Sequence, residues 1–217
     1  MSTGVVKPLA DGSAARVIRA LLDFRCVWTT HDLVTISELP AQTVRKVIGC
    51  LENEALVQRT GPGVVLVPSW LALLRRWSQD ARFGREAQVT RWRSKGGVQA
   101  LLTRLPTTPV SYTISGIAAA QQWVPRTPAG GPTIIYTPDA QVAATAWELV
   151  PATTSSIVLA EPASDVVFVR PRKTPTGLRM AAPAQVLADL LTGAGRSPSA
   201  ADQLSSWMLS NELQWRY

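Results

Sequence analysis

The sequence predicts a protein of the α+β class, in which a helix-rich N-terminal domain precedes a small mixed α/β C-terminal domain. Two observations support this prediction. Residues 12–80 hold stretches whose apolar side chains recur at helical spacing, and the chain beyond residue 106 alternates short apolar strands with helices. The composition, with 46% apolar and 17% charged residues, is typical of a globular protein that buries a core.

Two amphipathic helices are expected to begin and end the N-terminal domain. Residues 1–11 contain Gly, Pro and Ser without periodicity, so we expect a disordered lead before the first helix. Ser13 is a favourable N-cap for that helix. Its apolar positions are Val17, Ile18, Leu21 and Leu22. A later helix is expected from Trp70 to Asp80, with Trp70, Leu73, Leu74 and Trp77 on one side.

The stretch from Thr30 to Val57 predicts two helices separated by a tight turn. Thr30 is a favourable N-cap for a short helix that runs to Ser37. Pro40 then opens a longer helix, because proline is tolerated in a first helical turn, where its missing N–H would have no partner. Two helices joined by a break at residues 38–39 form a helix-turn-helix.

The second helix of this pair has one apolar and one polar face. The apolar side chains, expected to be buried, are Val44, Val47, Ile48 and Leu51. The other positions, which we interpret as a surface that reads a DNA groove, are Gln42, Thr43, Arg45, Lys46, Gly49 and Asn53. Arg and Lys pair with guanine edges or phosphates, and Gln or Asn can bond adenine through two hydrogen bonds. The alternative is an ordinary exposed helix face, which commonly carries the same residue types.

Two short strands follow the helix-turn-helix. Leu56–Thr60 and Val64–Val67 read as strands, and Gly61-Pro62-Gly63 between them is a turn signal. A further strand is expected within Phe24–Thr30. This order of elements predicts a winged helix-turn-helix DNA-binding domain over residues 12–80. On its wing, Arg59 and Thr60 are expected to touch the DNA backbone or the minor groove.

Positive charge concentrates just after this domain. Residues 81–105, interpreted as a basic linker and helix, carry six Lys and Arg against one Glu and account for +5 of the net charge of +7. Arg91, Arg93 and Lys95 are therefore predicted to contact phosphates. The alternative is a solvated face between domains. Trp92 either stacks between these cations and nucleic acid or docks into the second domain.

The C-terminal α+β domain is expected to span residues 106–217. Strands are predicted at 110–114, 133–137, 155–160, 165–170 and 178–182, and helices at 116–123, 138–148, 183–193 and 198–211. The helix of the preceding basic segment is predicted at 98–105. The domain has neither His nor Cys, and its carboxylates form no D-x-D pair, so we expect no enzyme activity, no metal and no cofactor. Arg170-Pro171-Arg172-Lys173 is either a further backbone contact or a loop tip.

Other features suggest a cytoplasmic protein that does not enter a membrane. No apolar run reaches the roughly 18 residues of a membrane span, and the N-terminus lacks the apolar region of a secretion signal. Cys26 and Cys50 are expected to be small buried apolar residues without a disulfide.

The C-terminal half resembles the AbiEi family of antitoxin-like regulators. The resemblance rests on four segments and extends from about Ser13 to Arg216. The four segments are VSYTISGIAAA at 110–120, TIIYT at 133–137, SSIVLAEPASDVVFVRP at 155–171 and the stretch 181–208. Its most specific part pairs the helix start Pro183-Ala184-Gln185 with Asp189-Leu190-Leu191 and the following Gly195-Arg196. The resemblance implies a winged DNA-binding repressor, which in toxin–antitoxin members controls its own operon and accompanies a nucleotidyltransferase toxin.

The sequence therefore predicts a sequence-specific DNA-binding transcriptional regulator. Its expected partner is double-stranded DNA. The C-terminal domain would serve for self-association, for binding a cognate protein or for further DNA contact. The alternative is a protein-interaction module that uses the winged fold without binding DNA. Heparin binding and a salt-sensitive shift of duplex DNA distinguish the two.

Overall fold

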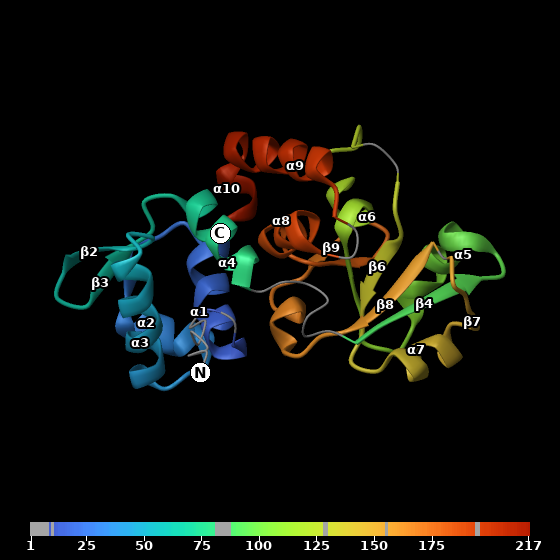
Figure 1. Cartoon of the computed structure of the whole chain (residues 1–217), viewed down its shortest axis with the longest axis horizontal. Coiled ribbons are helices and arrows are strands. Elements are labelled where there is room, and N and C mark those ends of the chain that lie inside the picture. Colours follow the sequence, from blue (N-terminus) through green and yellow to red (C-terminus); the bar gives the residue numbers. More distant parts are fainter. Residues whose placement is uncertain (1–8, 10, 81–87, 128–129, 155, 194–195) are drawn as a thin grey trace, which may run out of the picture. The chain divides into compact units, whose positions relative to one another are not determined.

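The computed structural model describes residues 9, 11–80, 88–127, 130–154, 156–193 and 196–217. The chain belongs to the α+β class and divides into two compact units. The first unit comprises Met1–Ala81 and Glu212–Tyr217, and the second comprises Arg82–Asn211 (Figure 1). The predicted lead, except Leu9 and Asp11, lies outside the described residues.

The first unit combines helices with a small antiparallel sheet. In chain order its elements are α1 (Gly12–Asp23), β1 (Trp28–Thr29), α2 (Thr30–Ser37), α3 (Ala41–Asn53), β2 (Gln58–Gly61), β3 (Val64–Leu66), α4 (Trp70–Asp80) and α10 (Glu212–Trp215). The three strands lie in the order β1-β3-β2, and both pairings are antiparallel. The predicted helices and the β2–β3 hairpin are present, with bounds shifted by a few residues.

Local capping explains where α1 and α2 begin. Asp11, not Ser13, caps α1, and its side chain accepts a hydrogen bond of 2.6 Å from the Ala14 amide. Thr29 caps α2 in a capping box with Asp32, one residue before the cap predicted from the sequence. Glu38 ends α2 in the left-handed conformation with φ of 56°, and this conformation turns the chain toward α3.

The core of the first unit forms from the apolar stripes of its helices. The predicted stripe of α3 is confirmed, because Val44, Val47, Ile48 and Leu51 are all buried. The four apolar positions expected on α4 are buried as well. Cys26 is exposed and Cys50 is half-buried, so the expectation that both are buried is wrong. Both thiols are free.

The last residues of the chain complete the first unit, although the sequence predicts them in the C-terminal domain. Trp215 is 1% exposed and meets the ring of Trp70 edge to face at 4.9 Å. The buried guanidinium of Arg216 donates hydrogen bonds to three main-chain carbonyls at the end of α1. These belong to Leu21, Leu22 and Phe24, at 3.0, 2.8 and 2.8 Å. Arg216 thus satisfies carbonyls that a helix end leaves without partners.

The second unit is built on a mixed seven-stranded sheet. Its strands are β4 (Gln88–Ser94), β5 (Thr113–Ser115), β6 (Thr133–Tyr136), β7 (Leu149–Pro151), β8 (Ile157–Glu161), β9 (Arg172–Lys173) and β10 (Arg179–Met180), in the order β7-β4-β8-β6-β5-β10-β9. Its α-helices are α5 (Gly97–Arg104), α6 (Gly116–Ala120), α7 (Ala140–Ala146), α8 (Pro183–Thr192) and α9 (Pro198–Ser210). Two short 3₁₀ turns occupy Leu105–Thr107 and Asp165–Phe168.

A buried carboxylate joins α8 to the sheet. Asp189 accepts hydrogen bonds from the Ser115 hydroxyl at 2.5 Å, the Tyr136 hydroxyl at 3.0 Å and the Gln185 amide at 3.0 Å. Burial raises the pKa of Tyr136 well above its ordinary value, so this side chain remains a neutral donor. α9 in turn packs on α8 (Figure 1).

Residues 88–105, predicted as part of a linker, instead belong to the second unit. β4 is an inner strand that pairs with β7 on one side and β8 on the other. Trp92 docks into this unit, with 6% exposure and a hydrogen bond of 2.7 Å from its indole N–H to the Thr90 hydroxyl. The alternative of Trp92 as a stacking platform is therefore wrong. Residues 81–87 of the predicted linker lie outside the described part of the chain.

The structure corrects two further expectations for the second unit. The segment 165–170, predicted as a strand, begins with a 3₁₀ turn. Arg172 and Lys173 form the edge strand β9, so half of the basic run 170–173 lies in the sheet and not at a loop tip. Within the described residues, no helix has the length and apolar character needed to cross a membrane.

Candidate nucleic-acid interface

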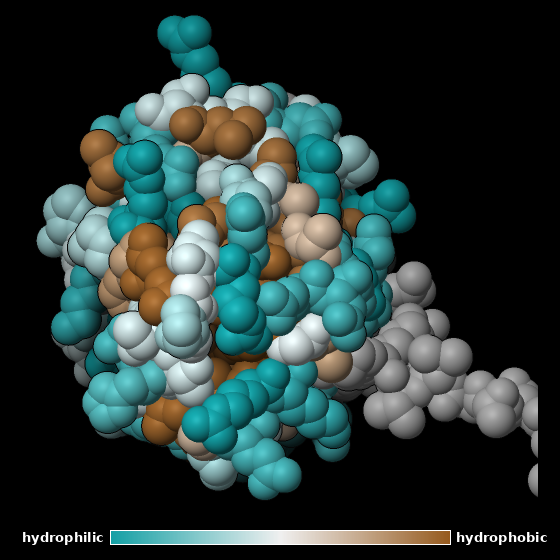
Figure 2. Space-filling model, turned by 90° about the vertical axis from the view of Figure 1, so that its left-hand side faces the viewer, coloured by the Kyte–Doolittle hydropathy of each residue, from teal (hydrophilic) through white to brown (hydrophobic). Residues whose placement is uncertain are grey.

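The outer face of α3 carries polar and basic side chains. Gln42, Arg45, Lys46 and Asn53 are exposed, and Thr43 and Gly49 are half-buried. Arg45 and Lys46 therefore lie opposite the buried stripe of the same helix, as the helical period predicts. A Cβ added to Gly49 would meet no atom within 4 Å, so the glycine is not required for packing within the protein. The surface of this side of the unit is mainly hydrophilic, with separate apolar areas (Figure 2).

The acidic side chains near the end of α3 are held by arginines. Glu52 accepts two hydrogen bonds from the Arg59 guanidinium, at 2.9 and 3.2 Å. This contact lowers the pKa of Glu52 and raises the pKa of Arg59. Glu54 is held in the same way by Arg76, at 2.6 and 3.0 Å. Each carboxylate is thus paired with an arginine, and Arg76 also pairs with Asp80 at 2.7 Å.

Arg45 and Lys46 differ from these arginines. No hydrogen bond or ion pair joins either side chain to another residue in the part of the chain that the structure describes. Their charges thus remain uncompensated on the outer face of α3. Two cations side by side on an exposed helix are suited to a polyanion such as a nucleic-acid backbone.

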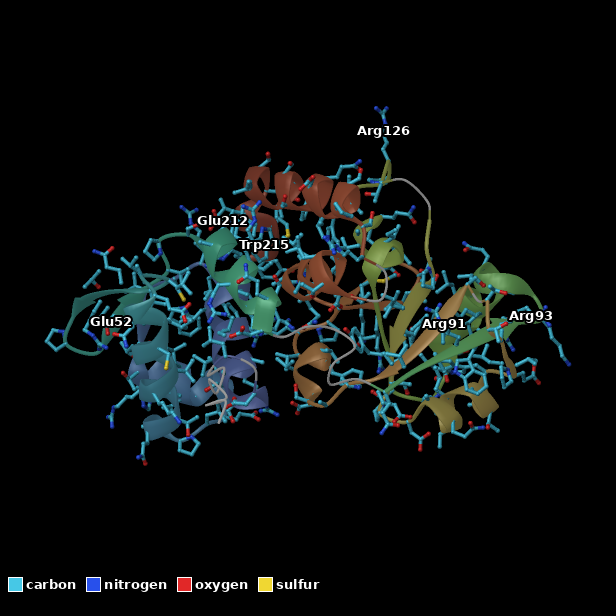
Figure 3. All side chains as sticks on the ribbon, in the orientation of Figure 1. Glu52, Arg91, Arg93, Arg126, Glu212 and Trp215 are labelled. Carbon is cyan, nitrogen blue, oxygen red and sulfur yellow. The ribbon has the colours of Figure 1, made fainter. Side chains whose placement is uncertain are left out.

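The hairpin of β2 and β3 contributes less positive charge than the sequence suggests. Thr60 is exposed on β2, and Gly63 turns the hairpin with φ of +71°, a conformation that favours glycine. Arg59 is exposed as well, but its guanidinium is engaged by Glu52 on α3 (Glu52 is labelled in Figure 3). The charge of Arg59 is therefore balanced within the unit, and its expected contact with the DNA backbone or minor groove stays a prediction.

The remaining predicted contacts lie in the second unit. Arg91 and Arg93 are exposed and extend from β4, whereas Trp92 and Ser94 between and beside them are buried (Figure 3). This alternation follows from the two-residue period of a strand. Lys95 is exposed in the turn that follows. The three cations form a local group, which belongs to a different unit from Arg45 and Lys46.

Sequence reasoning missed the ion pair between Glu52 and Arg59. The two residues are seven positions apart and lie on different elements, α3 and β2. Pairing of charges on one helix is signalled by a spacing of three or four residues, but no such rule covers a helix and a following strand. The described residues contain no group of three or more His, Cys, Asp or Glu arranged to hold a metal ion.

Comparisons with known proteins give no relative for this chain. No protein-family model, no curated protein and no solved structure matches it. What the chain binds is therefore inferred from its own surface.

Proposed function

We propose that this chain is a DNA-binding transcriptional regulator and that its N-terminal unit is a winged helix-turn-helix. The order of elements supports the proposal: α2, a tight turn and α3 are followed by the β2–β3 hairpin, which shares a sheet with β1. In such a domain the second helix of the helix-turn-helix enters the major groove. Here that helix is α3.

The chemistry of the exposed face of α3 is the observation that carries the proposal. Arg45 and Lys46 have no acidic partner among the described residues, whereas Glu52 is paired with Arg59 and Glu54 shares Arg76 with Asp80. A phosphate backbone approaching α3 would thus meet two available cations. Gln42 and Asn53 add carboxamides, which suit the edge of adenine.

The second unit is proposed to add sequence-independent contacts. Arg91, Arg93 and Lys95 are exposed cations that suit phosphates, and phosphate contacts position a protein without reading sequence. The AbiEi resemblance of the C-terminal half supports a further proposal, that the chain is an antitoxin-like repressor of its own operon. A cognate toxin or a second copy of the chain would then bind through this unit.

The test is a double substitution on α3. Arg45→Ala with Lys46→Ala should weaken binding to DNA from upstream of the chain's own gene by at least about tenfold at fixed salt, because two direct contacts are lost. The measurement is fluorescence anisotropy with a labelled duplex. The control is Arg75→Ala with Arg126→Ala, which removes the same charge from exposed positions on α4 and on a turn of the second unit.

Equal affinities for the α3 variant and the parental chain would contradict the role of α3. If the parental chain binds neither the duplex nor heparin at low salt, the proposed DNA-binding function is wrong. The protein-interaction module is then the better description.

A further inference from the structure

The second unit contains a cleft of about 600 Å³ that the proposed function does not use. It lies among α5, α6, β10 and the turn at residues 174–177. Its volume falls in the range of sites that hold small molecules. All of its lining residues belong to one unit, so its shape does not depend on the first unit.

The floor of the cleft is apolar. Leu102, Pro106 and Leu178 are half-buried and offer apolar surface to a ligand. Ile114 on β5 and Met180 on β10 also line the cleft but are buried, with 0% and 2% exposure, so they present almost no surface to it. On one side of the cleft, the turn at residues 174–177 lies close to Pro106. A Cβ added at Gly177 would lie only 3.3 Å from the Pro106 ring. The φ of +88° at Gly177 permits this close approach. A flat apolar or aromatic body fits such a floor.

The rim of the cleft is polar but carries no charge. Three carboxamides, from Gln99, Gln121 and Gln122, and two hydroxyls, from Thr103 and Thr176, line it. No Asp, Glu, Lys, Arg or His is among the lining residues that the structure describes. A charged ligand would lose hydration here without gaining a counter-charge, so the lining favours a neutral molecule.

The carboxamides keep hydrogen-bonding capacity for a ligand. The Gln121 amide nitrogen donates to the Thr127 carbonyl at 3.2 Å, which leaves its side-chain oxygen as an acceptor. The side-chain amides of Gln99 and Gln122 make no hydrogen bond to another described residue. Each carboxamide offers a donor and an acceptor side by side, which matches a planar heterocycle with an adjacent donor and acceptor.

We propose that this cleft binds an uncharged nucleoside, with the base on the floor formed by Leu102, Pro106 and Leu178 and held at its edge by the glutamines. A second hollow of about 200 Å³ adjoins it and shares Ala118 and Gln121. It is lined by Thr133, Ser156 and the Gly130–Gly131 pair, so it offers hydroxyls and main-chain groups to a sugar. This inference goes beyond DNA binding and does not depend on it.

The test is isothermal titration calorimetry of the full chain without DNA. The probes are adenosine, guanosine, cytidine and uridine, each compared with its 5′-monophosphate. At least one nucleoside should bind with a micromolar Kd. Its monophosphate should bind at least about tenfold more weakly, because the doubly charged phosphate finds no cation in the cleft.

Two variants and one control locate the binding. Gln99→Leu with Gln122→Leu should weaken nucleoside binding at least about tenfold, because a base edge is left without partners. Ala118→Phe should do the same by occupying the space between the two hollows. Gln141→Leu replaces an exposed glutamine on α7 outside the cleft, so its Kd should not change. Thermal unfolding of each variant checks that it folds.

The proposal is overturned if none of the four nucleosides binds, or if a monophosphate binds as tightly as its nucleoside. It is also overturned if a folded cleft variant keeps the parental Kd. None of these results bears on α3 and DNA, because the titration contains no duplex.

Discussion

At the scale of single residues, the pair of Glu52 and Arg59 governs the charge of the candidate interface. The Glu52 carboxylate neutralises the arginine of the hairpin and leaves Arg45 and Lys46 as the available cations of that face. Both partners are substantially exposed, with side-chain exposures of 38% and 43%, so the pair contributes little to folding stability. Its main effect is on the electrostatic potential at the surface that DNA would approach.

Glu52→Gln should therefore strengthen DNA binding without unfolding the protein. The substitution removes one negative charge and releases Arg59 to a phosphate, so affinity for any duplex should rise. The slope of log affinity against log salt should steepen by about 0.9, the value for one added phosphate contact. The measurement is a salt titration by fluorescence anisotropy.

The matched control is Glu148→Gln, which breaks the exposed pair of Glu148 and Arg104 in the second unit with the same change of charge. An unchanged slope for Glu52→Gln would show that Arg59 does not reach the duplex.

At the scale of elements, β4 combines a core side chain with outward cations. Trp92 is buried in the second unit, and Arg91 and Arg93 on either side of it are exposed. One strand thus holds the sheet together and presents charge, because successive side chains of a strand point to opposite faces.

Replacing Arg91, Arg93 and Lys95 together by Ala should separate these two roles. Affinity should fall to a similar degree for all DNA sequences, and the salt slope should become shallower by up to about 0.9 for each lost phosphate contact. The unfolding temperature should stay close to the parental value, since the three side chains are exposed. If this variant keeps the salt slope of the parental chain, the cations of β4 do not contact phosphates and the strand has only a structural role.

Trp92→Ala is the complementary change in the same strand. It should lower the free energy of unfolding of the second unit by about 3–5 kcal/mol, because a large buried side chain leaves a cavity. Chemical unfolding followed by circular dichroism measures this loss. A loss no larger than that of the exposed Arg91→Ala would contradict the assignment of Trp92 to the core.

At the scale of the whole molecule, the two ends of the chain build one unit. The side chains of Trp215 and Arg216 fill a place against Trp70 and the end of α1. Burial lowers the pKa of Arg216, and the contact with Glu212 opposes this shift. Residues 12–80 alone therefore do not make up the complete N-terminal unit.

Removing residues 212–217 should lower the unfolding temperature of the first unit. The truncation leaves the carbonyls of Leu21, Leu22 and Phe24 without their partner and removes a buried indole, and the loss of the indole alone costs about 3–5 kcal/mol. Differential scanning calorimetry measures the change. Leu213→Ala, on an exposed side chain of the same segment, should leave the transition unchanged. An equally stable truncated chain would show that the segment is dispensable.

The sequence by itself determined the elements whose signals are local. The apolar stripe of α3, the turn before it and the β2–β3 hairpin follow from helical period, positional preferences and turn residues, all of which act within a few positions. The outward position of Arg45 and Lys46 is a consequence of the same period. The buried face of α4 was predictable on the same basis, whereas α8 is buried along nearly its whole length.

Only the tertiary structure decided which distant segments meet. β4 could not be recognised as an inner strand, because its partners β7 and β8 lie more than fifty residues away. The return of Arg216 to α1 spans nearly two hundred positions, and Glu52 meets Arg59 across two different elements. Long-range contacts form because folding buries apolar surface and satisfies main-chain groups wherever the chain permits, and no short sequence pattern records the partner.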